Sequence, residues 1–150
     1  MAEDGRKEWV FDDIEKGARL TDTTYTITTE ILEKYLDGVD DLNPLYMDEA
    51  YAKKTPFGGR IAPPISMGIY TTISNLIRPM GLKTPDGLIQ ASQKYEFTGV
   101  ARPDEELLIK SLVEDKFEKK GRKFVVLRSE VFNPQGEKVG TSWVTGIWSK

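Results

Sequence analysis

The sequence feature that most constrains the fold is an uncharged run between Arg60 and Arg78. Charged residues make up 30% of the chain, yet none lies between these two arginines. Pro63 and Pro64 suit a first helical turn, where a missing N–H costs nothing. Apolar and small residues then recur with helical spacing at Ile65, Ile69, Thr72, Ile73, Leu76 and Ile77. The run predicts a helix from about Pro63 to Arg78 that is buried on every face. It is shorter than the roughly 20 apolar residues that cross a bilayer.

The residue types that are missing exclude several kinds of chemistry. The 150-residue chain has no cysteine and no histidine, which excludes disulfides, thiolate metal sites, cysteine nucleophiles and histidine-based catalysis. Any proton transfer must therefore use Asp, Glu, Lys, Tyr or water. The net charge of -3 disfavours nucleic acid or an anionic membrane as a partner, because these select a basic face. The polar, acidic start has no apolar segment typical of a signal peptide, so we expect a cytoplasmic protein.

The remaining pattern predicts a single α+β domain over residues 1–150. Residues 23–28 indicate a short strand, and a helix follows that is capped by Thr28 or Thr29. After a turn at Asn43, residues 48–54 predict a short helix and residues 55–60 a loop. From residue 89 the period changes to two, which predicts strands at 89–97, 107–117, 124–132 and 139–148. A curved antiparallel sheet wrapped around one long buried helix satisfies this order.

Three motifs in a fixed order resemble those of a known family. They are D-x-N-P-L from Asp41, D-E-A-Y-A from Asp48 and F-G-G-R-I-A from Phe57. Their combination, ahead of long antiparallel strands, resembles the MaoC-like hydratases and dehydratases, which have the hotdog fold. The variants at Tyr46 and at residues 62–64 are most similar to one subfamily. That subfamily supplies the N-terminal halves, or one subunit, of double-hotdog and heteromeric hydratases.

The resemblance implies a ligand and a set of site residues. The ligand is a thioester of coenzyme A (CoA) or acyl carrier protein (ACP), to which water is added or from which it is removed. Family members use an Asp and a His around one water, and a backbone N–H at the start of the central helix holds the thioester oxygen. Asp41 matches the aspartate, and Asn43 and Pro44 match the turn behind it. The substrate-binding residues implied in this way are Asn43, Gly58, Gly59, Arg60, Ile61, Ala62, Pro63 and Met67.

Two departures from the family pattern affect the expected chemistry. Tyr46 occupies the position of the catalytic histidine, and a phenol with an ordinary pKa of about 10 is a poor base near neutrality. Pro64 occupies the position of the glycine at the helix start, and a proline cannot donate an N–H. A positioned acid/base group contributes about 10²–10⁴-fold, and an oxyanion donor about 10²–10³-fold. We therefore expect this chain to bind the acyl thioester beside a partner subunit that carries the complete Asp/His pair.

Each candidate residue also has a purely structural interpretation. Asp41 is either a retained acid or a turn residue, and Tyr46 is either an acid oriented by Asp41 or a packed phenol. The pair Gly58–Gly59 either lets the chain approach a ligand closely or supplies positive φ angles. Arg60 and the basic cluster within 119–123 either contact phosphate or are solvated.

Three functions stay open at this point. The first is the binding subunit described above. An active homodimeric hydratase would instead use Asp41 with Tyr46 or Glu49, and a thioesterase or acyl-CoA sensor is a third choice, because fold alone does not decide function. In each case we expect a homodimer or a heterodimer with a catalytic MaoC-like subunit, since one sheet around one helix leaves an edge strand to protect. No metal or redox cofactor is implied.

Overall fold

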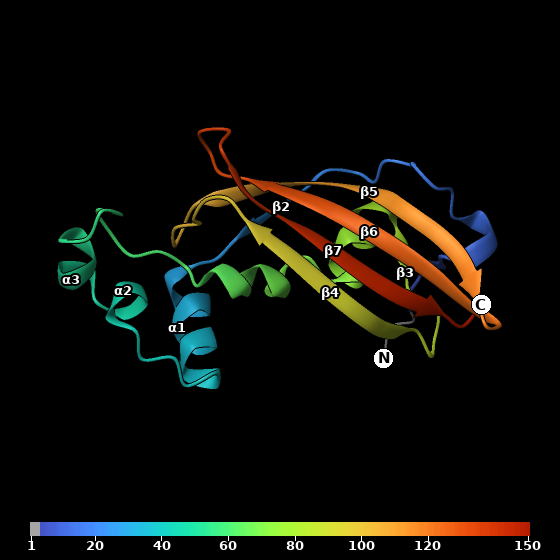
Figure 1. Cartoon of the computed structure of the whole chain (residues 1–150), viewed down its shortest axis with the longest axis horizontal. Coiled ribbons are helices and arrows are strands. Elements are labelled where there is room, and N and C mark those ends of the chain that lie inside the picture. Colours follow the sequence, from blue (N-terminus) through green and yellow to red (C-terminus); the bar gives the residue numbers. More distant parts are fainter. Residues whose placement is uncertain (1–3) are drawn as a thin grey trace.

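A five-stranded antiparallel sheet curves along the length of the molecule, and helical segments cover its concave face (Figure 1). The computed structural model describes residues 4–150. The strands of this sheet lie in the order β2-β5-β6-β7-β4. Their bounds are Thr23–Thr26 for β2, Ile89–Phe97 for β4, Glu106–Lys119 for β5, Arg122–Phe132 for β6 and Lys138–Trp148 for β7. The structure therefore confirms the α+β class and the five strands that the sequence predicts.

The pairing of β4 is a feature that periodicity does not reveal. This strand does not pair with β5, which follows it, but with β7, so that Phe97 faces Gly140 and Ile89 faces Ile147. The other long edge of β4 is open, and most of its residues are exposed on both faces. The sequence predicts one wet face for this strand. The second face is also largely open because β4 lies at the rim of the sheet.

The N-terminal segment closes the end of the sheet that lies opposite the helices α1–α3 (Figure 1). Its two-residue strand β1 (Lys7–Glu8) pairs in parallel with β3 (Leu82–Lys83), and a 3₁₀ turn, η1, follows at Phe11–Asp13. The indole N–H of Trp148 donates to the Trp9 carbonyl at 2.7 Å, and the two rings meet edge to face. These contacts anchor the segment on the core.

The prediction of one continuous helix over residues 63–78 is wrong. The chain forms a 3₁₀ segment, η2 (Pro64–Ile69), then α4 (Ile73–Ile77), then a second 3₁₀ turn, η3 (Arg78–Met80). Polar side chains bond to backbone carbonyls at the break: the Thr71 hydroxyl donates at 2.8 Å to the Met67 carbonyl, which also accepts from the Thr71 N–H, and the Asn75 amide donates to the Ile69 carbonyl at 3.0 Å. The Thr72 hydroxyl accepts from the Asn75 N–H and so begins α4. Such local bonds compete with the helical ladder.

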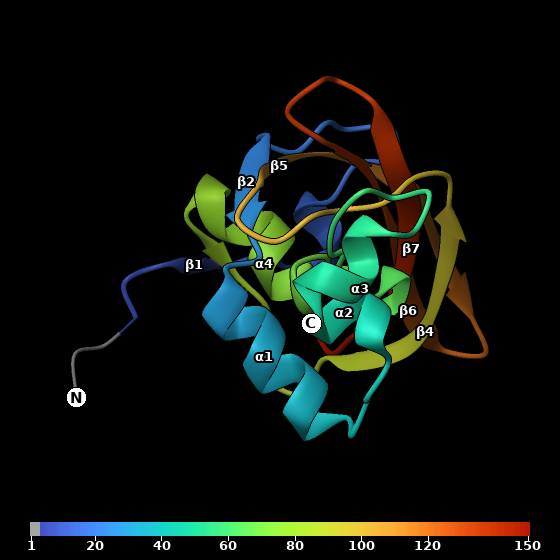
Figure 2. The same ribbon diagram turned by 90° about the vertical axis from the view of Figure 1, so that its left-hand side faces the viewer.

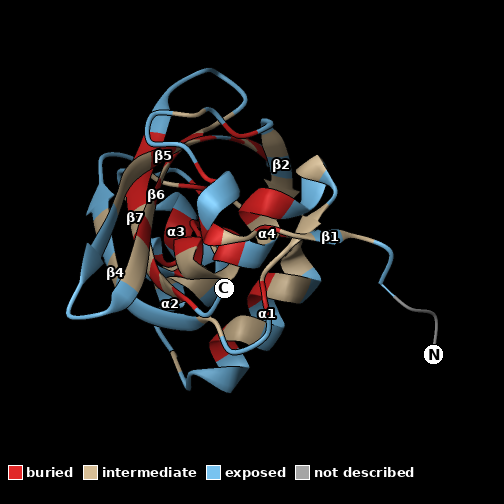
Figure 3. Cartoon of the chain, turned by 90° about the vertical axis from the view of Figure 1, so that its right-hand side faces the viewer, coloured by how far each residue is buried: buried red, intermediate tan, exposed pale blue. Residues whose placement is uncertain are grey.

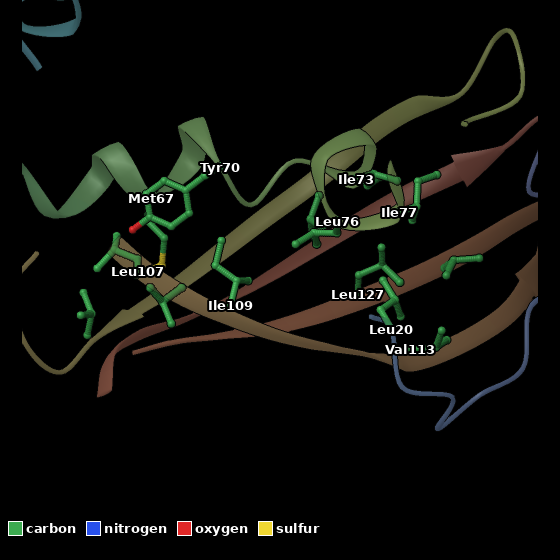
Figure 4. Close-up of a cluster of buried hydrophobic side chains, with 14 of the residues drawn as sticks. Leu20, Met67, Tyr70, Ile73, Leu76, Ile77, Leu107, Ile109, Val113 and Leu127 are labelled. Carbon is green, nitrogen blue, oxygen red and sulfur yellow. The ribbon is translucent and has the colours of Figure 1, made fainter. Parts of the chain in front are cut away.

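The expectation that this segment is buried on every face is also wrong. The side of η2 and α4 that faces the sheet is buried, with Met67 and Tyr70 near Leu107 and with Leu76 above the sheet (Figure 4). The other side is open, since Ile65 is 53% exposed and Ser74 is exposed. The buried residues gather between the sheet and these segments (Figure 3). The core is therefore one layer that the sheet and the two segments share.

Three short helices project at one end of the sheet (Figure 2). They are α1 (Thr29–Gly38), α2 (Pro44–Met47) and α3 (Glu49–Lys53). The hydroxyl of Thr28 accepts from the Ile31 N–H at 3.1 Å and caps α1, as the sequence predicts. Within residues 4–150, no helix has the length and apolar character needed to cross a membrane.

Candidate functional site

The turn after α1 holds Asp41, the candidate acid. The backbone N–H of Asp41 donates to the Leu36 carbonyl at 2.9 Å, and one oxygen of its carboxylate, Oδ1, accepts from the Asn43 N–H at 3.1 Å. Asn43 in turn accepts from the Leu45 N–H through Oδ1 at 3.0 Å and caps α2, with Pro44 in the first helical turn. The structural role that the sequence suggests for Asp41 is therefore present, and Asn43 acts as a cap.

Tyr46 lies on α2 close to this carboxylate. Burial of the phenol raises its pKa above the usual value, and the charges of Asp41 and Tyr35 raise it further. The same two causes, burial and then Asp41, raise the pKa of Tyr35. Both phenols therefore stay protonated near neutral pH, so they can donate a hydrogen bond but cannot take a proton from water. The structure places Asp41 and Tyr46 near each other, and Tyr46 is a hydrogen-bond donor there.

The loop at residues 55–60 is tied down by side chains on both sides. Gly58 has a φ of 69°, which favours glycine. A Cβ on Gly59 would lie 3.2 Å from Oε1 of Glu49 and 3.4 Å from Nη1 of Arg102. The Arg102 guanidinium donates to the Phe57 carbonyl, so it holds the loop from the other side. The sequence does not indicate a role for Arg102, because the local pattern shows only that this residue lies in a turn between two predicted strands.

Arg60 connects this loop to the Asp41 turn. Its side chain is only 17% exposed, and Nε lies 3.4 Å from Oε2 of Glu49. Arg60 and Asp41 line a pocket of about 220 Å³ at the end of α1. The rest of its lining is apolar or acidic, namely Glu33, Leu36, Asp37, Asp40, Leu42 and Met47. Of the predicted substrate-binding residues, Arg60 is the one that shares a pocket with Asp41.

The other predicted binding residues after Arg60 lie in the core. Ile61, Ala62 and Met67 are 3%, 2% and 1% exposed, and Pro63 is also buried. The Ala62 N–H donates to the Ala101 carbonyl at 2.7 Å, so this amide is already used. Because residues 63 and 64 are both prolines, Ile65 has the first N–H at the start of η2. The oxyanion donor that the family places one residue earlier is thus missing here.

Two side chains fill the space between η2 and the rim of the sheet. A Cβ on Gly68 would lie 2.7 Å from the Tyr95 hydroxyl, and a Cβ on Gly140 would lie 2.7 Å from Cε of Met67. Tyr95 comes from β4 and is half-buried, with its pKa raised by burial and by Tyr35. The sequence indicates Tyr95 only as a strand residue. The one feature of the sequence that indicates this contact is Gly68, because a glycine inside a helical segment often marks a position where another residue packs closely.

The site has donor groups that can bind a polar ligand. Across residues 4–150, no three acidic side chains converge in an arrangement that would hold a metal ion. The pocket beside Asp41 brings together one guanidinium, that of Arg60, and four carboxylates, those of Glu33, Asp37, Asp40 and Asp41. The phenols of Tyr35 and Tyr46 lie near Asp41. This set can orient a polar ligand by hydrogen bonds and charge.

Comparison with known proteins agrees with this architecture. Residues 15–142 match the family described as FAS1-like, dehydratase domain region. The chain is similar to the MaoC-like dehydratase from Rhodospirillum rubrum, with 23% identity and a TM-score of 0.76 over 95% of this chain and 98% of that one. It is similar to the R-hydratase PhaJ1 from Pseudomonas aeruginosa, with 26% identity and a TM-score of 0.73 over 93% and 84%.

A third similar structure is the HadBC complex from Mycobacterium tuberculosis, a (3R)-hydroxyacyl-ACP dehydratase. The identity is 19% and the TM-score 0.74, over 88% of this chain and 96% of that one. Each likeness spans most of both chains. The hotdog fold that the motifs imply is thereby confirmed.

Proposed function

The chain belongs to the FAS1-like dehydratase domain family of MaoC-like hotdog proteins, and from this premise we propose that it is a binding subunit of an (R)-specific enoyl-thioester hydratase or 3-hydroxyacyl dehydratase. In this role it contributes to holding a CoA or ACP thioester, while a second hotdog subunit carries the complete Asp/His pair. The heteromeric HadBC complex, which has the same fold, supports such an arrangement.

The observation that carries this proposal is the state of Tyr46. Hydration of an enoyl thioester needs one group to take a proton from water as oxygen bonds to Cβ, and a group that delivers a proton to Cα. Tyr46 stands where the family has histidine, and its raised pKa keeps the phenol protonated. Pro64 removes the expected oxyanion donor. Losing an acid/base group costs about 10²–10⁴-fold, and losing an oxyanion donor about 10²–10³-fold.

The structure weakens the case for a homodimeric enzyme that uses Glu49. One carboxylate oxygen of Glu49 is engaged, since Oε2 lies 3.4 Å from both Nε and the backbone N of Arg60, while the side chain stays 51% exposed. With Oε2 held by Arg60, only Oε1 is left to contact water. Glu49 instead fixes the position of Arg60.

The test is an assay of the purified chain with crotonyl-CoA, following loss of the conjugated thioester absorbance. We expect no turnover above background from the chain alone and turnover from a complex with a subunit that has the Asp/His pair. Ordinary enzyme rates from the chain alone would contradict the proposal. Release of free CoA thiol would instead indicate a thioesterase.

A gain-of-function variant sharpens this test. Tyr46→His with Pro64→Gly restores both missing groups beside Asp41, so the double variant should hydrate crotonyl-CoA and each single variant should do so at least about tenfold less well. Adding Asp41→Asn is the matched control and should remove the gained activity. If the double variant folds, binds crotonyl-CoA and stays inactive, Tyr46 and Pro64 do not account for the missing catalysis.

A further inference from the structure

The outer face of the sheet, which turns away from η2 and α4, has no helix over it within residues 4–150 (Figure 2). Along β5, buried side chains alternate with more exposed ones, so Leu108, Lys110 and Leu112 point outward. Two pockets of about 280 and 630 Å³ lie on this face and share Lys110 and Phe132 in their lining. The two pockets therefore adjoin, and neither has a lining residue in common with the pocket beside Asp41.

Three cations surround the smaller of the two pockets, which we call the outer pocket. Its lining includes Arg19, Lys110 and Arg128 against one carboxylate, that of Glu130. Leu112 pairs with Arg19 on one side and with Arg128 on the other, and directly opposed residues of antiparallel strands point to the same face. The two arginines therefore flank Leu112. Lys110 lies two residues away along the same strand, so it points to the same face as well.

Most of this positive charge is not neutralised by the protein itself. Arg19 and Lys110 are exposed and have no ion-pair partner in the part of the chain that the structure describes. Glu130 lies 3.1 Å from Nζ of Lys138 but 3.9 Å from Nη2 of Arg128, so it pairs mainly with Lys138. The outer pocket therefore favours an anion, although the chain as a whole has a net charge of -3.

Arg128 has two hydrogen-bond donors that the protein does not use. Its Nη1 lies 3.1 Å from Oε2 of Glu114. On the other edge of the guanidinium, Nε is buried with no hydrogen-bond partner among the described residues, and Nη2 has only its 3.9 Å contact with Glu130. The N–H groups of Nε and Nη2 point in the same direction, and this fork matches two oxygens of a carboxylate or a phosphate. A buried donor without a partner costs free energy, and an anion bound at this edge relieves that cost.

From this arrangement we propose that the outer pocket binds the anionic group of a small organic carboxylate or phosphate monoester, and that the apolar body of the ligand lies in the adjoining pocket. The adjoining pocket offers Leu108, Phe132 and Pro134 to such a body. Its one carboxylate, Glu106, balances its one cation, Lys110, so it does not itself select a charge. An apolar lining beside a few convergent polar groups is typical of small-molecule sites. The inference does not depend on the proposed function, because the outer pocket is separate from the candidate functional site.

The test is a titration of the full isotope-labelled chain, in which NMR shifts of the backbone amides report both affinity and place of binding. Phenyl phosphate and phenylacetate carry an anionic group on an apolar body, benzyl alcohol has a similar body without charge, and inorganic phosphate has the charge without the body. The site variant combines Arg19→Gln with Lys110→Gln. The control variant combines Lys53→Gln with Lys54→Gln, which removes two cations that are also exposed and without an ion pair in the described chain but lie outside the outer pocket.

We expect phenyl phosphate, phenylacetate or both to shift the amides of Leu112 and Arg128 with a millimolar or tighter dissociation constant. The site variant should raise this constant about tenfold, because it removes two charge-assisted contacts, and the control variant should leave it unchanged. Tighter binding of phenyl phosphate would identify a phosphate monoester as the ligand class, and tighter binding of phenylacetate a carboxylate.

Three results would overturn the inference. They are no amide shift at Leu112 and Arg128 with either anion, the same affinity in the site variant and the control variant, and binding of benzyl alcohol as tight as that of the anions. Inorganic phosphate should bind more weakly than phenyl phosphate. Equal affinity for these two would overturn the role of the adjoining pocket.

Discussion

Asp104 is the residue that joins the helical end of the molecule to the sheet. It lies just before β5 with a φ of 65°, and its N–H donates to the Ile27 carbonyl at 2.7 Å. Its carboxylate accepts from both the backbone N–H of Thr29, at 2.9 Å, and the Thr29 hydroxyl, at 2.7 Å. The contact fixes the start of α1, and through α1 it fixes the turn that holds Asp41.

The first prediction concerns the pH dependence of this contact. The Thr29 hydroxyl, followed by the Thr29 N–H and the charge of Arg60, lowers the pKa of Asp104 below its usual value of 3.8. A lowered pKa in the folded state stabilises the protein above the unfolded pKa of about 3.9, and this stability is lost as the pH falls through the folded pKa. Asp104→Asn should therefore lower the thermal midpoint at pH 7, and the difference from wild type should shrink as the pH falls below about 4.

The control for this prediction is Asp22→Asn, a change to an exposed residue before β2. Its thermal midpoint should follow that of the wild type from pH 7 to pH 3. A constant difference between Asp104→Asn and wild type across this range would show that the carboxylate charge is not what stabilises the contact.

The sequence predicted some of the site at the level of single residues. Asp41, Asn43 and Tyr46 lie close together because all three belong to one turn and a short helix, and their role in a site stays a prediction. The D-x-N-P motif did not predict Arg102 or Tyr95, whose roles come from contacts with residues about 30 to 45 positions away. Such pairings depend on the register of the sheet, which the local pattern does not encode.

Among the elements, the segment at residues 63–80 shows why helical spacing of apolar residues was not enough to predict a continuous helix. Its spacing of apolar residues is helical, but only the face toward the sheet is buried, whereas burial on every face was predicted. Thr71, Thr72 and Asn75 bond through their side chains to backbone groups at the break. The hydrophobic period indicates which face is buried. It does not indicate which polar side chains will bond to backbone groups in place of the helical partners.

A second prediction tests how tightly η2 packs on the sheet. A Cβ on Gly140 of β7 would lie 2.7 Å from both the Glu96 carbonyl oxygen and Met67 Cε. Met67 is flexible, but the β4 backbone cannot move without loosening its pairing with β7. Gly140→Ala should therefore lower the free energy of unfolding by about 1–3 kcal/mol, measured by denaturant titration.

Gly38→Ala is the matched control for this substitution. Gly38 ends α1 with no heavy atom within 4 Å of the added Cβ. Alanine there should raise the free energy of unfolding by about 0.5–1 kcal/mol, because glycine loses more conformational freedom on folding. If both substitutions have the same effect, the close approach of Met67 and Glu96 to Gly140 does not limit the packing.

For the molecule as a whole, the order of the strands and the antiparallel pairs β5–β6 and β6–β7 agree with the prediction, and the neighbour of β4 does not. The bounds of β4 to β7 agree with the alternating patterns to within two residues. The alternation of apolar and polar residues does not indicate that β4 pairs with β7 and leaves its other edge open. The pairing partner depends on contacts between strands that are distant in the sequence. An open edge of nine residues is unusual in a protein that stays monomeric.

The last prediction concerns this edge. Ile89 and Phe97 begin and end β4 and are 59% and 44% exposed. In an antiparallel pair of β4 strands, the Ile89 end of one copy lies beside the Phe97 end of the other, so both apolar side chains lose exposure. Replacing them by lysine, Ile89→Lys with Phe97→Lys, should raise the dimer dissociation constant by at least about tenfold, because burial of each such side chain contributes about 1.5–3 kcal/mol.

Light scattering at micromolar concentration checks this outcome, with a dimer mass for the wild type and a monomer mass for the variant. Phe117→Lys is the control, since Phe117 is 37% exposed at the β5 end of the hairpin, away from β4. The lysine pair should hardly change the stability of the single chain, because both side chains already face solvent there. A variant that keeps the dimer mass would place the interface on another face.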